Sequence, residues 1–333
     1  MFQSTARWIR AHKFLAIGAA LLTLFLALNI VSYLHARAMT HFVAAGARTA
    51  PPEQLTTASK LGVLLTGVTV PRPVNHETPA GYGMAFTTHR TRSSDAIDLE
   101  LWHIAAESKQ SPRTIILLFH AYASSKQMML PAARELHEMG YDTLLIDFRG
   151  CGGSSGNATT IGFKEADDVI AAMRFAREEF APDRVILFGD SMGAAAVIRA
   201  ASIDPKLADG LIVAAPFDRL LSTVENRFAA MKLPALPFAR LICFWGGVQH
   251  GYWASDHNPA EYATKFGIPV LHLHGAHDPR VTTDQARDLF GRFASAKRFV
   301  IFEDAGHASH LRADRAKWVR EVRSFVESLG DLR

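Results

Sequence analysis

Cysteine is scarce in this chain, and its scarcity removes two structural classes. Only Cys151 and Cys243 occur among 333 residues. Two cysteines cannot supply the disulfide framework of a small secreted domain or the four thiolates of a zinc ribbon. A single disulfide between them is compatible with the sequence, so cysteine usage leaves the redox compartment open.

Acidic residues are absent from the first fifty positions, which hold five basic residues. Those five charges exceed the net charge of the whole chain, which is +4, so the remainder is close to neutral. A domain without excess positive charge is poorly suited to nucleic acid or another polyanion. We therefore expect no nucleic-acid partner.

Nucleotide-binding glycine patterns are also missing. The stretch DFRGCGGSSG at 147–156 has serine at position 155, where GxGxxG requires glycine, and no P-loop lysine follows. We interpret it as a tight turn and expect no cofactor. The sequence shows no internal repeat or low-complexity tract, and with 49% apolar residues it can bury a large core.

One long apolar run is present at residues 14–34. Its 21 residues carry no formal charge and suffice to cross a bilayer as a helix. Basic residues are denser before the run than directly after it, which predicts that residues 1–13 lie in the cytoplasm and the rest lies across the membrane. The far side would be the periplasm if the source is a Gram-negative bacterium. A cleaved signal peptide is the alternative, since residues 36–38 read small-x-small, but the run exceeds the usual signal core. We predict an uncleaved single-pass anchor.

Residues 35–80 are predicted to be a linker, with proline breakers at 51–52 and 71–73. Within it, Leu61–Val70 is compatible with a short strand or a short helix. The main domain is expected at 81–333, opening with an antiparallel hairpin formed by Met84–His89 and Ile97–Ile104.

From position 112 onward, short apolar runs alternate with helical patterns such as Lys164–Phe180. The runs have the length of strands buried on both faces and lie at 115–119, 143–146, 185–188, 211–213, 268–273 and 299–302. The alternation predicts an α/β fold with a mostly parallel sheet between helices. A stretch at about 217–265 breaks the alternation with many aromatic residues, and we interpret it as a helical cap over the core edge or a ligand cleft.

The strongest chemical signal is Gly189-Asp190-Ser191-Met192-Gly193, between an apolar run and a small-residue helical pattern. A sharp strand-to-helix turn holds a serine in a strained conformation and excludes bulky neighbours, which explains both glycines. The pattern predicts Ser191 as a nucleophile. It also places the Met192 amide at a helix N-terminus, where negative charge is favoured.

A serine nucleophile needs a base and a group that orients the base. Asp278 follows the apolar run 268–273, and His307 follows the run 299–302, so both are expected beyond the carboxyl ends of strands. We predict a Ser191, His307 and Asp278 triad. The loop after run 115–119 should supply a second oxyanion donor, the Tyr122 amide, while His120 in that loop is interpreted as structural.

From about residue 84 to 330 the chain resembles the α/β-hydrolases, in the branch of serine aminopeptidase-like and lysophospholipase-like proteins. The resemblance rests on FHAYASSK at 119–126, DFRGCGGSSG, TTIGFKEADDV at 159–169, FGDSMGAAA at 188–196, IPVLHLHGAHDPRV at 268–281 and EDAGH at 303–307. It implies the α/β-hydrolase fold and the chain order Ser, Asp, His for the triad. One departure is Ala121, where the family usually has glycine; a positive φ there would strain alanine and displace the Tyr122 amide.

These features together predict a membrane-anchored serine hydrolase that cleaves carboxylic esters, with lipophilic acyl esters as the expected substrates. The sequence leaves the physiological substrate and the oligomeric state open. A peptidase is an alternative, and its substrate ammonium would need acids such as Asp218, Glu225, Asp256 or Glu261. A zinc hydrolase using His272, His274 and His277 is disfavoured by the spacing, so no metal is expected. A membrane-tethered binding protein on a hydrolase scaffold is the non-enzymatic alternative.

Overall fold

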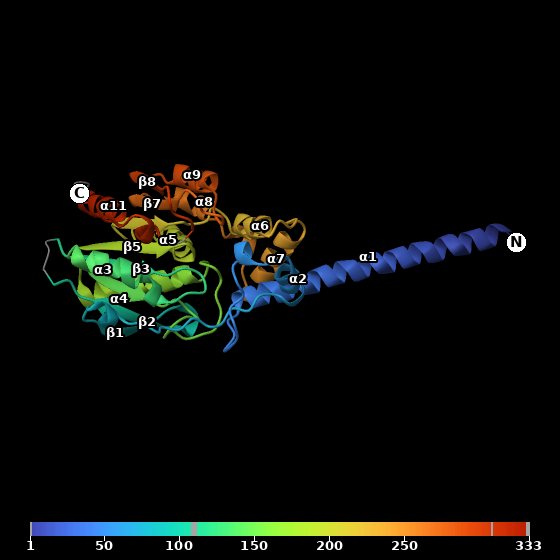
Figure 1. The fold of residues 1–333 in the computed structure, drawn as a ribbon, viewed down its shortest axis with the longest axis horizontal. Helices are drawn as coiled ribbons and strands as arrows, with labels where there is room; N and C mark the ends of the chain where they lie inside the picture. The colour runs from blue at the N-terminus through green and yellow to red at the C-terminus, as the bar shows by residue number, and fades with distance from the viewer. Residues whose placement is uncertain (1, 108–111, 308, 331–333) are drawn as a thin grey trace.

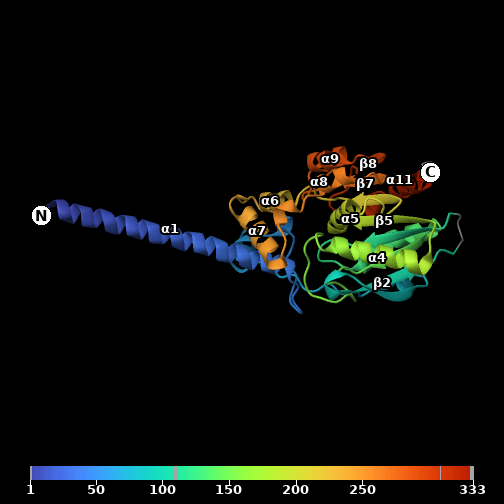
Figure 2. The ribbon, with the colours of Figure 1, turned by 180° about the vertical axis from the view of Figure 1, so that it is seen from behind.

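The computed structural model describes residues 2–107, 112–307 and 309–330, so the outermost residues of the predicted N-terminal segment and main domain lie outside it. Helix α1, Phe2–Thr40, projects away from the sheet, and α2, α6 and α7 gather around its C-terminal end (Figures 1 and 2). Within α1, residues His12–Thr40 are long and apolar enough to cross a membrane. The apolar run therefore folds as a helix, as predicted, and this helix is a candidate membrane span.

An eight-stranded sheet forms the centre of the main domain, in the order β1-β2-β4-β3-β5-β6-β7-β8. The strands β1 and β2 form the predicted hairpin, β2 pairs antiparallel with β4, and all later neighbours are parallel. Their bounds are Thr87–Arg92, Asp98–Ile104, Thr114–Phe119, Asp142–Ile146, Arg184–Asp190, Gly210–Ala214, Val270–Gly275 and Lys297–Phe302. The predicted mostly parallel sheet is confirmed.

Two strands begin later than their apolar runs suggest. Strand β7 starts at Val270 because Pro269 has no N–H to donate to a ladder, although its carbonyl accepts from Leu211. Strand β1 starts at Thr87, while Met84 is buried as packing rather than paired.

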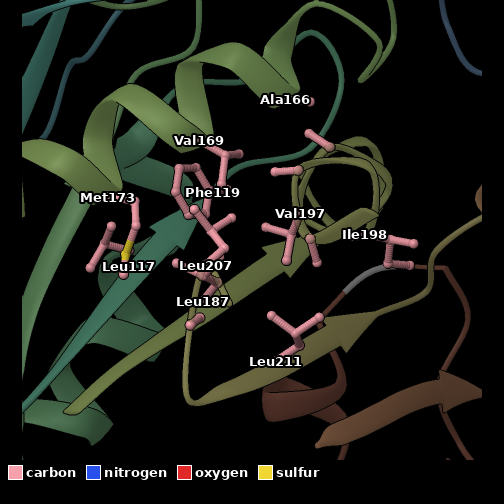
Figure 3. Packing of buried hydrophobic residues seen from close by; sticks show 14 of the residues in the cluster. Leu117, Phe119, Ala166, Val169, Met173, Leu187, Val197, Ile198, Leu207 and Leu211 are labelled. Atoms are coloured by element: carbon pink, nitrogen blue, oxygen red, sulfur yellow. The ribbon is translucent and has the colours of Figure 1, made fainter. Parts of the chain in front are cut away.

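Helices cover both faces of the sheet. On one face, α4, Glu165–Phe180, and α5, Met192–Ile203, pack with α8, Pro259–Tyr262, and α9, Thr283–Arg292. Figure 3 shows Val169 and Met173 of α4 and Val197 of α5 against Leu117 and Leu187 of the strands. The other face is covered by α3, Leu130–Glu138, and α11, Arg315–Ser328, which follows the short α10, His310–Ala313. The central strands β3 to β7 are thus buried on both sides, and their ends remain available for a site.

The apolar stretch predicted as a cap forms helices α6, Leu220–Ala230, and α7, Phe238–His250. Residues 35–80, predicted as a linker, contain the end of α1 and helix α2, Thr57–Thr66, which answers the open question about Leu61–Val70 in favour of a helix over most of its length. Ala36 of α1 is buried in one cluster with Val224, Phe228 and Ile242 of the cap. The N-terminal segment and the cap therefore pack as one layer.

A buried carboxylate fixes the loops at the end of β4. The Asp147 carboxylate accepts hydrogen bonds from the Lys126 backbone at 2.7 Å, from Gly153 N–H at 2.9 Å and from the Asn75 amide at 2.7 Å, and it pairs with the Lys126 ammonium. Burial alone would raise the pKa of Asp147, but the Lys126 charge holds it below the usual value. Lys126, whose side chain is fully buried, also pairs with Glu100. These contacts join the loop after β3 to the glycine-rich turn.

We predict that Asp147→Asn lowers the free energy of unfolding by about 3–5 kcal/mol, because removing one partner leaves the Lys126 charge buried with less compensation. Chemical denaturation of the purified full-length protein measures this. Asp98→Asn is the control: its pair with Arg92 is exposed and 3.9 Å long, so the cost should stay below about 1 kcal/mol. Equal costs for the two variants would contradict the structural role assigned to Asp147.

Candidate active site

Ser191 lies at a strained turn between β5 and α5. Its φ of 51° and ψ of −107° are unfavourable for a residue with a side chain. The flanking glycines permit this turn: a Cβ on Gly189 would lie 2.5 Å from Ala194, and one on Gly193 would lie 2.3 Å from the Phe119 carbonyl oxygen. The backbone of Ser191 is held by its N–H, which donates to the Ala214 carbonyl at 2.8 Å. The elbow inferred from the motif is present in the structure.

The three residues predicted as a triad are brought together by three separate loops. Ser191 Oγ lies 2.9 Å from His307 Nε2, and His307 Nδ1 lies 2.7 Å from Asp278 Oδ2. These hydrogen-bond partners assign the tautomer of His307. Its Nδ1–H donates to the Asp278 carboxylate, which leaves Nε2 to accept from the Ser191 hydroxyl. The loops meet because Gly275, which ends β7, lacks a Cβ that would lie 2.1 Å from the Gly306 carbonyl oxygen.

Asp278 is oriented by more than the histidine. Its Oδ1 accepts the N–H of Arg280 at 2.8 Å and of Val281 at 3.1 Å, which leaves Oδ2 for His307. Burial would raise the pKa of this carboxyl, but the hydrogen bond and charge of His307 and the two amides hold it below the usual value. Asp278 therefore stays ionised and can stabilise an imidazolium.

Met192 and Tyr122, the residues whose amides are predicted as oxyanion donors, line the same cavity as Ser191. Met192 is the first residue of α5, so its N–H has no acceptor within the helix. Among the described residues, neither the Met192 nor the Tyr122 amide has a hydrogen-bond acceptor. The phenol of Tyr122 is fixed separately, by donating to the Met39 carbonyl of α1 at 2.5 Å.

The concern about Ala121 is resolved by the loop geometry. The left-handed residue of this loop is Ala123, with φ of 51°, whereas Ala121 is not among the described residues with positive φ. Replacement of glycine by alanine at 121 therefore carries no left-handed strain. His120 is fully buried, with Nε2 accepting from the Phe148 N–H at 3.1 Å and Nδ1 bonded to the Ala121 carbonyl, which fits the predicted structural role.

A cavity of about 670 Å³ adjoins Ser191 and His307. On one side it runs between α3 and α11, past Ala132, Leu311 and Trp318. On the other side its walls come from the cap and from the N-terminal segment, whose lining residues are His35, Met39, Arg48, Thr49, Ala50, Pro51, Pro52, Leu55, Val63, Leu64, Val68, Thr69 and Val70. Sequence reasoning missed this second wall. The apolar stretch Leu61–Val70 was the available signal, but it carries no chemical motif.

The alternative metal site does not assemble. Among the described residues, no three His, Cys, Asp or Glu side chains come together as ligands. His272 and His274 are buried on the same face of β7, with ring centroids 6.3 Å apart, and both pack near Phe299. Burial lowers the pKa of both imidazoles, as expected for neutral core histidines. Cys151 and Cys243 are free thiols.

Comparison with known proteins finds similar hydrolases and a similar membrane protein. The sequence model of the serine aminopeptidase S33 family matches residues 110–243. The lysophosphatidylserine lipase ABHD12 of Danio rerio is 23% identical over 258 residues, covering 71% of this chain and 66% of the relative. An uncharacterised membrane protein of Saccharomyces cerevisiae is 27% identical over 232 residues, covering 69% of this chain and 75% of the relative.

The fold is shared with solved structures. The Pyrococcus furiosus esterase Pf2001 superposes with a TM-score of 0.65 at 23% identity, covering 78% of this chain and 96% of the esterase. The chain thus has the α/β-hydrolase fold and is similar in sequence to proteins of that superfamily.

A second carboxyl, Asp190, lines the cavity beside Ser191. Burial raises its pKa to about 6, and the charge of His307 opposes that rise. Since the folded state binds the proton more tightly than the unfolded chain, this group lowers stability as the pH rises from about 4 to about 6.

We predict that Asp190→Asn removes this pH dependence. The stability of the variant relative to the wild type should increase by about 2–3 kcal/mol between pH 4 and pH 7, since one pKa unit corresponds to about 1.4 kcal/mol. Denaturant unfolding at both pH values measures it. The exposed Asp284→Asn is the control and should show no such change. A stability difference that is the same at both pH values would contradict the burial of the Asp190 charge.

Proposed function

We propose that the protein is a serine hydrolase that cleaves carboxylic esters through an acyl-enzyme. The observation that carries the proposal is the hydrogen-bonded chain from Ser191 through His307 to Asp278, at 2.9 and 2.7 Å, at the edge of a cavity. A serine hydroxyl becomes a competent nucleophile when an oriented base takes its proton, and these contacts provide both requirements.

The mechanism has two steps. Ser191 Oγ attacks the ester carbonyl carbon while His307 Nε2 takes the hydroxyl proton, and the amides of Met192 and Tyr122 bind the oxyanion. The protonated His307 then gives its proton to the leaving alcohol as the C–O bond breaks. Water attacks the acyl-enzyme with His307 again as base, which releases the acid and restores Ser191.

Lipophilic acyl esters are the proposed substrates. The cap side of the cavity is lined by apolar residues that include Leu55, Leu64, Val224, Phe228 and Ile242. Such a wall binds an acyl chain by removing apolar surface from water. A lysophosphatidylserine lipase and esterases among the similar proteins support an ester substrate of this kind.

Helix α1 is proposed as an uncleaved single-pass anchor. The apolar window within His12–Thr40 supports a membrane span, as does the similar membrane protein of Saccharomyces cerevisiae. The excess of basic residues before the span favours a cytoplasmic N-terminus and an extracytoplasmic catalytic domain, in the periplasm if the source is Gram-negative.

The peptidase alternative rests on the S33 match. Asp218, Glu225, Asp256 and Glu261, the acids considered for an ammonium site, are all described, and none of them lines the cavity. Asp218 instead accepts from the Ser222 hydroxyl, within the cap. Ester hydrolysis therefore has more support. A tethered binding protein would share the scaffold but would not react at Ser191.

We predict that a fluorophosphonate probe labels the detergent-solubilised full-length protein and does not label Ser191→Ala. Hydrolysis of nitrophenyl esters should fall by about 10⁶ in Ser191→Ala, because the nucleophile is lost, and by about 10⁴ in Asp278→Asn, because the histidine tautomer is no longer fixed. Ser222→Ala is the control, because the Ser222 hydroxyl lies in the cap and takes no part in the hydrogen bonds among Ser191, His307 and Asp278. Labelling of Ser191→Ala, or no labelling of folded wild type, would refute the proposal.

We predict that Val224→Phe shifts the acyl preference toward short chains. Val224 is buried and lines the cap side of the cavity, so a larger ring shortens the space for an acyl chain. The ratio of kcat/KM for dodecanoyl over acetyl nitrophenyl esters should fall about tenfold. Ile203→Phe, at an exposed position on α5, is the control. Active sites are counted with the fluorophosphonate probe, and an unchanged ratio would show that acyl chains bind elsewhere.

A further inference from the structure

The contact between α1 and the cap begins inside the apolar run of α1. Asn29 Oδ1 accepts the indole N–H of Trp245 at 3.1 Å, and the Tyr33 carbonyl accepts from the Gln249 amide at 2.9 Å. Ala36, one turn further, is buried in the cap cluster. Helix α7 therefore lies beside residues 29–36, at the end of α1 where the cap gathers (Figure 1).

The length of the apolar run limits where along α1 the bilayer core can lie. The part of the run before this contact, residues 14–28, is about 22 Å long as a helix. A bilayer core is about 30 Å thick and needs about 20 residues. The span cannot move toward the N-terminus, because Arg7, Arg10 and Lys13 lie there. Residues 29–34 must then also lie in the apolar layer, and α7, which packs on them, enters it by about 9 Å.

The cap surface at this level has the composition of a membrane interface. We define the cap patch as Phe244, Val248 and Trp253, whose exposed fractions are 41%, 50% and 59%. The centroid of the Phe244 ring lies 5.9 Å from that of Trp253 and 5.1 Å from that of Trp245. The Trp245 and Tyr33 ring centroids are 5.6 Å apart, which links the cluster to α1. The aromatic cluster is thus continuous with the span, and Trp and Tyr concentrate at the boundary between lipid and water.

The catalytic cavity reaches the same level. His35 and Met39 line it, and they follow directly after the apolar run on α1. The Met39 carbonyl also accepts from the phenol of Tyr122, which belongs to the loop proposed to hold the oxyanion. The distance from the bilayer boundary to the cavity wall is therefore a turn or two of one helix.

We propose that the cap patch is a bilayer-contact surface, embedded in the leaflet on the catalytic side, and that ester lipids enter the cavity from that leaflet. The embedding rests on the proposed span of α1, and the entry of substrate rests on the proposed esterase activity. The lipid leaflet is the occupant that the span itself brings to this surface. The span places the cap patch at the level of the lipid, but it does not bring a second copy of the chain or a soluble partner to this surface.

Depth measurements on the full-length protein in phosphatidylcholine–phosphatidylglycerol nanodiscs test the embedding. In a Cys243→Ser background, single cysteines replace Phe244, Val248 or Trp253 and carry a nitroxide, whose accessibility to oxygen and to a nickel chelate reports depth. Gly18→Cys reports the middle of the span, and Ile203→Cys reports an exposed apolar site away from the cap. Cap-patch labels should be shielded from nickel like the Gly18 label, and the Ile203 label should be exposed.

Each other outcome has a distinct meaning. Cap-patch labels open to nickel beside a shielded Gly18 label would overturn the embedding and keep the anchor. An exposed Gly18 label would refute the anchor itself. Spin–spin broadening of the cap-patch labels in nanodiscs that hold two copies would assign the surface to a second copy and overturn the proposal.

Substrate entry is tested with Val248→Lys/Trp253→Lys, beside Ile203→Lys as the matched control. None of these residues lines the cavity. Hydrolysis of a water-soluble acetyl ester should be unchanged in both variants, while hydrolysis of a bilayer-embedded ester should fall about tenfold only in the cap variant. Equal loss on both esters, or no loss on either, would refute entry from the leaflet. If the wild type cleaves neither ester, the esterase proposal fails, and the depth measurement still decides the embedding.

Discussion

The close approach of backbones at the carboxyl edge of the central strands is the constraint on which the site depends. Ser191 holds a conformation that costs on the order of 1–3 kcal/mol, and it persists because its surroundings leave no alternative. Gly189 and Gly193 let α5 pack directly against β5 and the end of β3. The same approach brings Met192 and Tyr122 to one cavity. Steric demands at two glycines thus position both the hydroxyl and the proposed oxyanion donors.

Two aspartates at this edge show how local contacts separate chemical roles. Asp278 accepts two backbone N–H groups and the His307 imidazole, which keeps its pKa low despite burial. For Asp190, one residue from the serine, no hydrogen bond to the carboxylate is found within the described part of the chain, and burial raises its pKa to about 6. Both carboxylates are largely ionised at neutral pH, but only Asp278 is oriented by hydrogen bonds to backbone amides and to the histidine, as proposed for catalysis. Proximity to Ser191 alone would have selected Asp190.

Much of the fold could be predicted because its signals are local. The strands from Ile115 to Phe302 are short apolar runs, and Gly189-x-Ser191-x-Gly193 describes a turn that few sequences satisfy sterically. Asp278 and His307 could be placed because each follows a strand. Their hydrogen-bonded geometry depends on the approach of the Gly275 and Gly306 backbones, which no periodicity reveals. Strand ends shifted where Pro269 lacks a donor, which is a local effect that the apolar pattern ignores.

The cavity wall formed by residues 35–70 was beyond sequence reasoning for a different reason. Helix α1, which begins this wall, contacts a cap some two hundred positions away, as between Asn29 and Trp245, and such pairs leave no mark in either segment alone. Asn29 is instructive, since it interrupts an apolar run for no reason visible in the sequence. In the structure its amide donates to the Phe25 carbonyl and its oxygen accepts the Trp245 indole, so the polar group is satisfied. A residue that weakens the membrane signal thus fastens the helix to the cap, and α1 is part of the cavity as well as the proposed anchor.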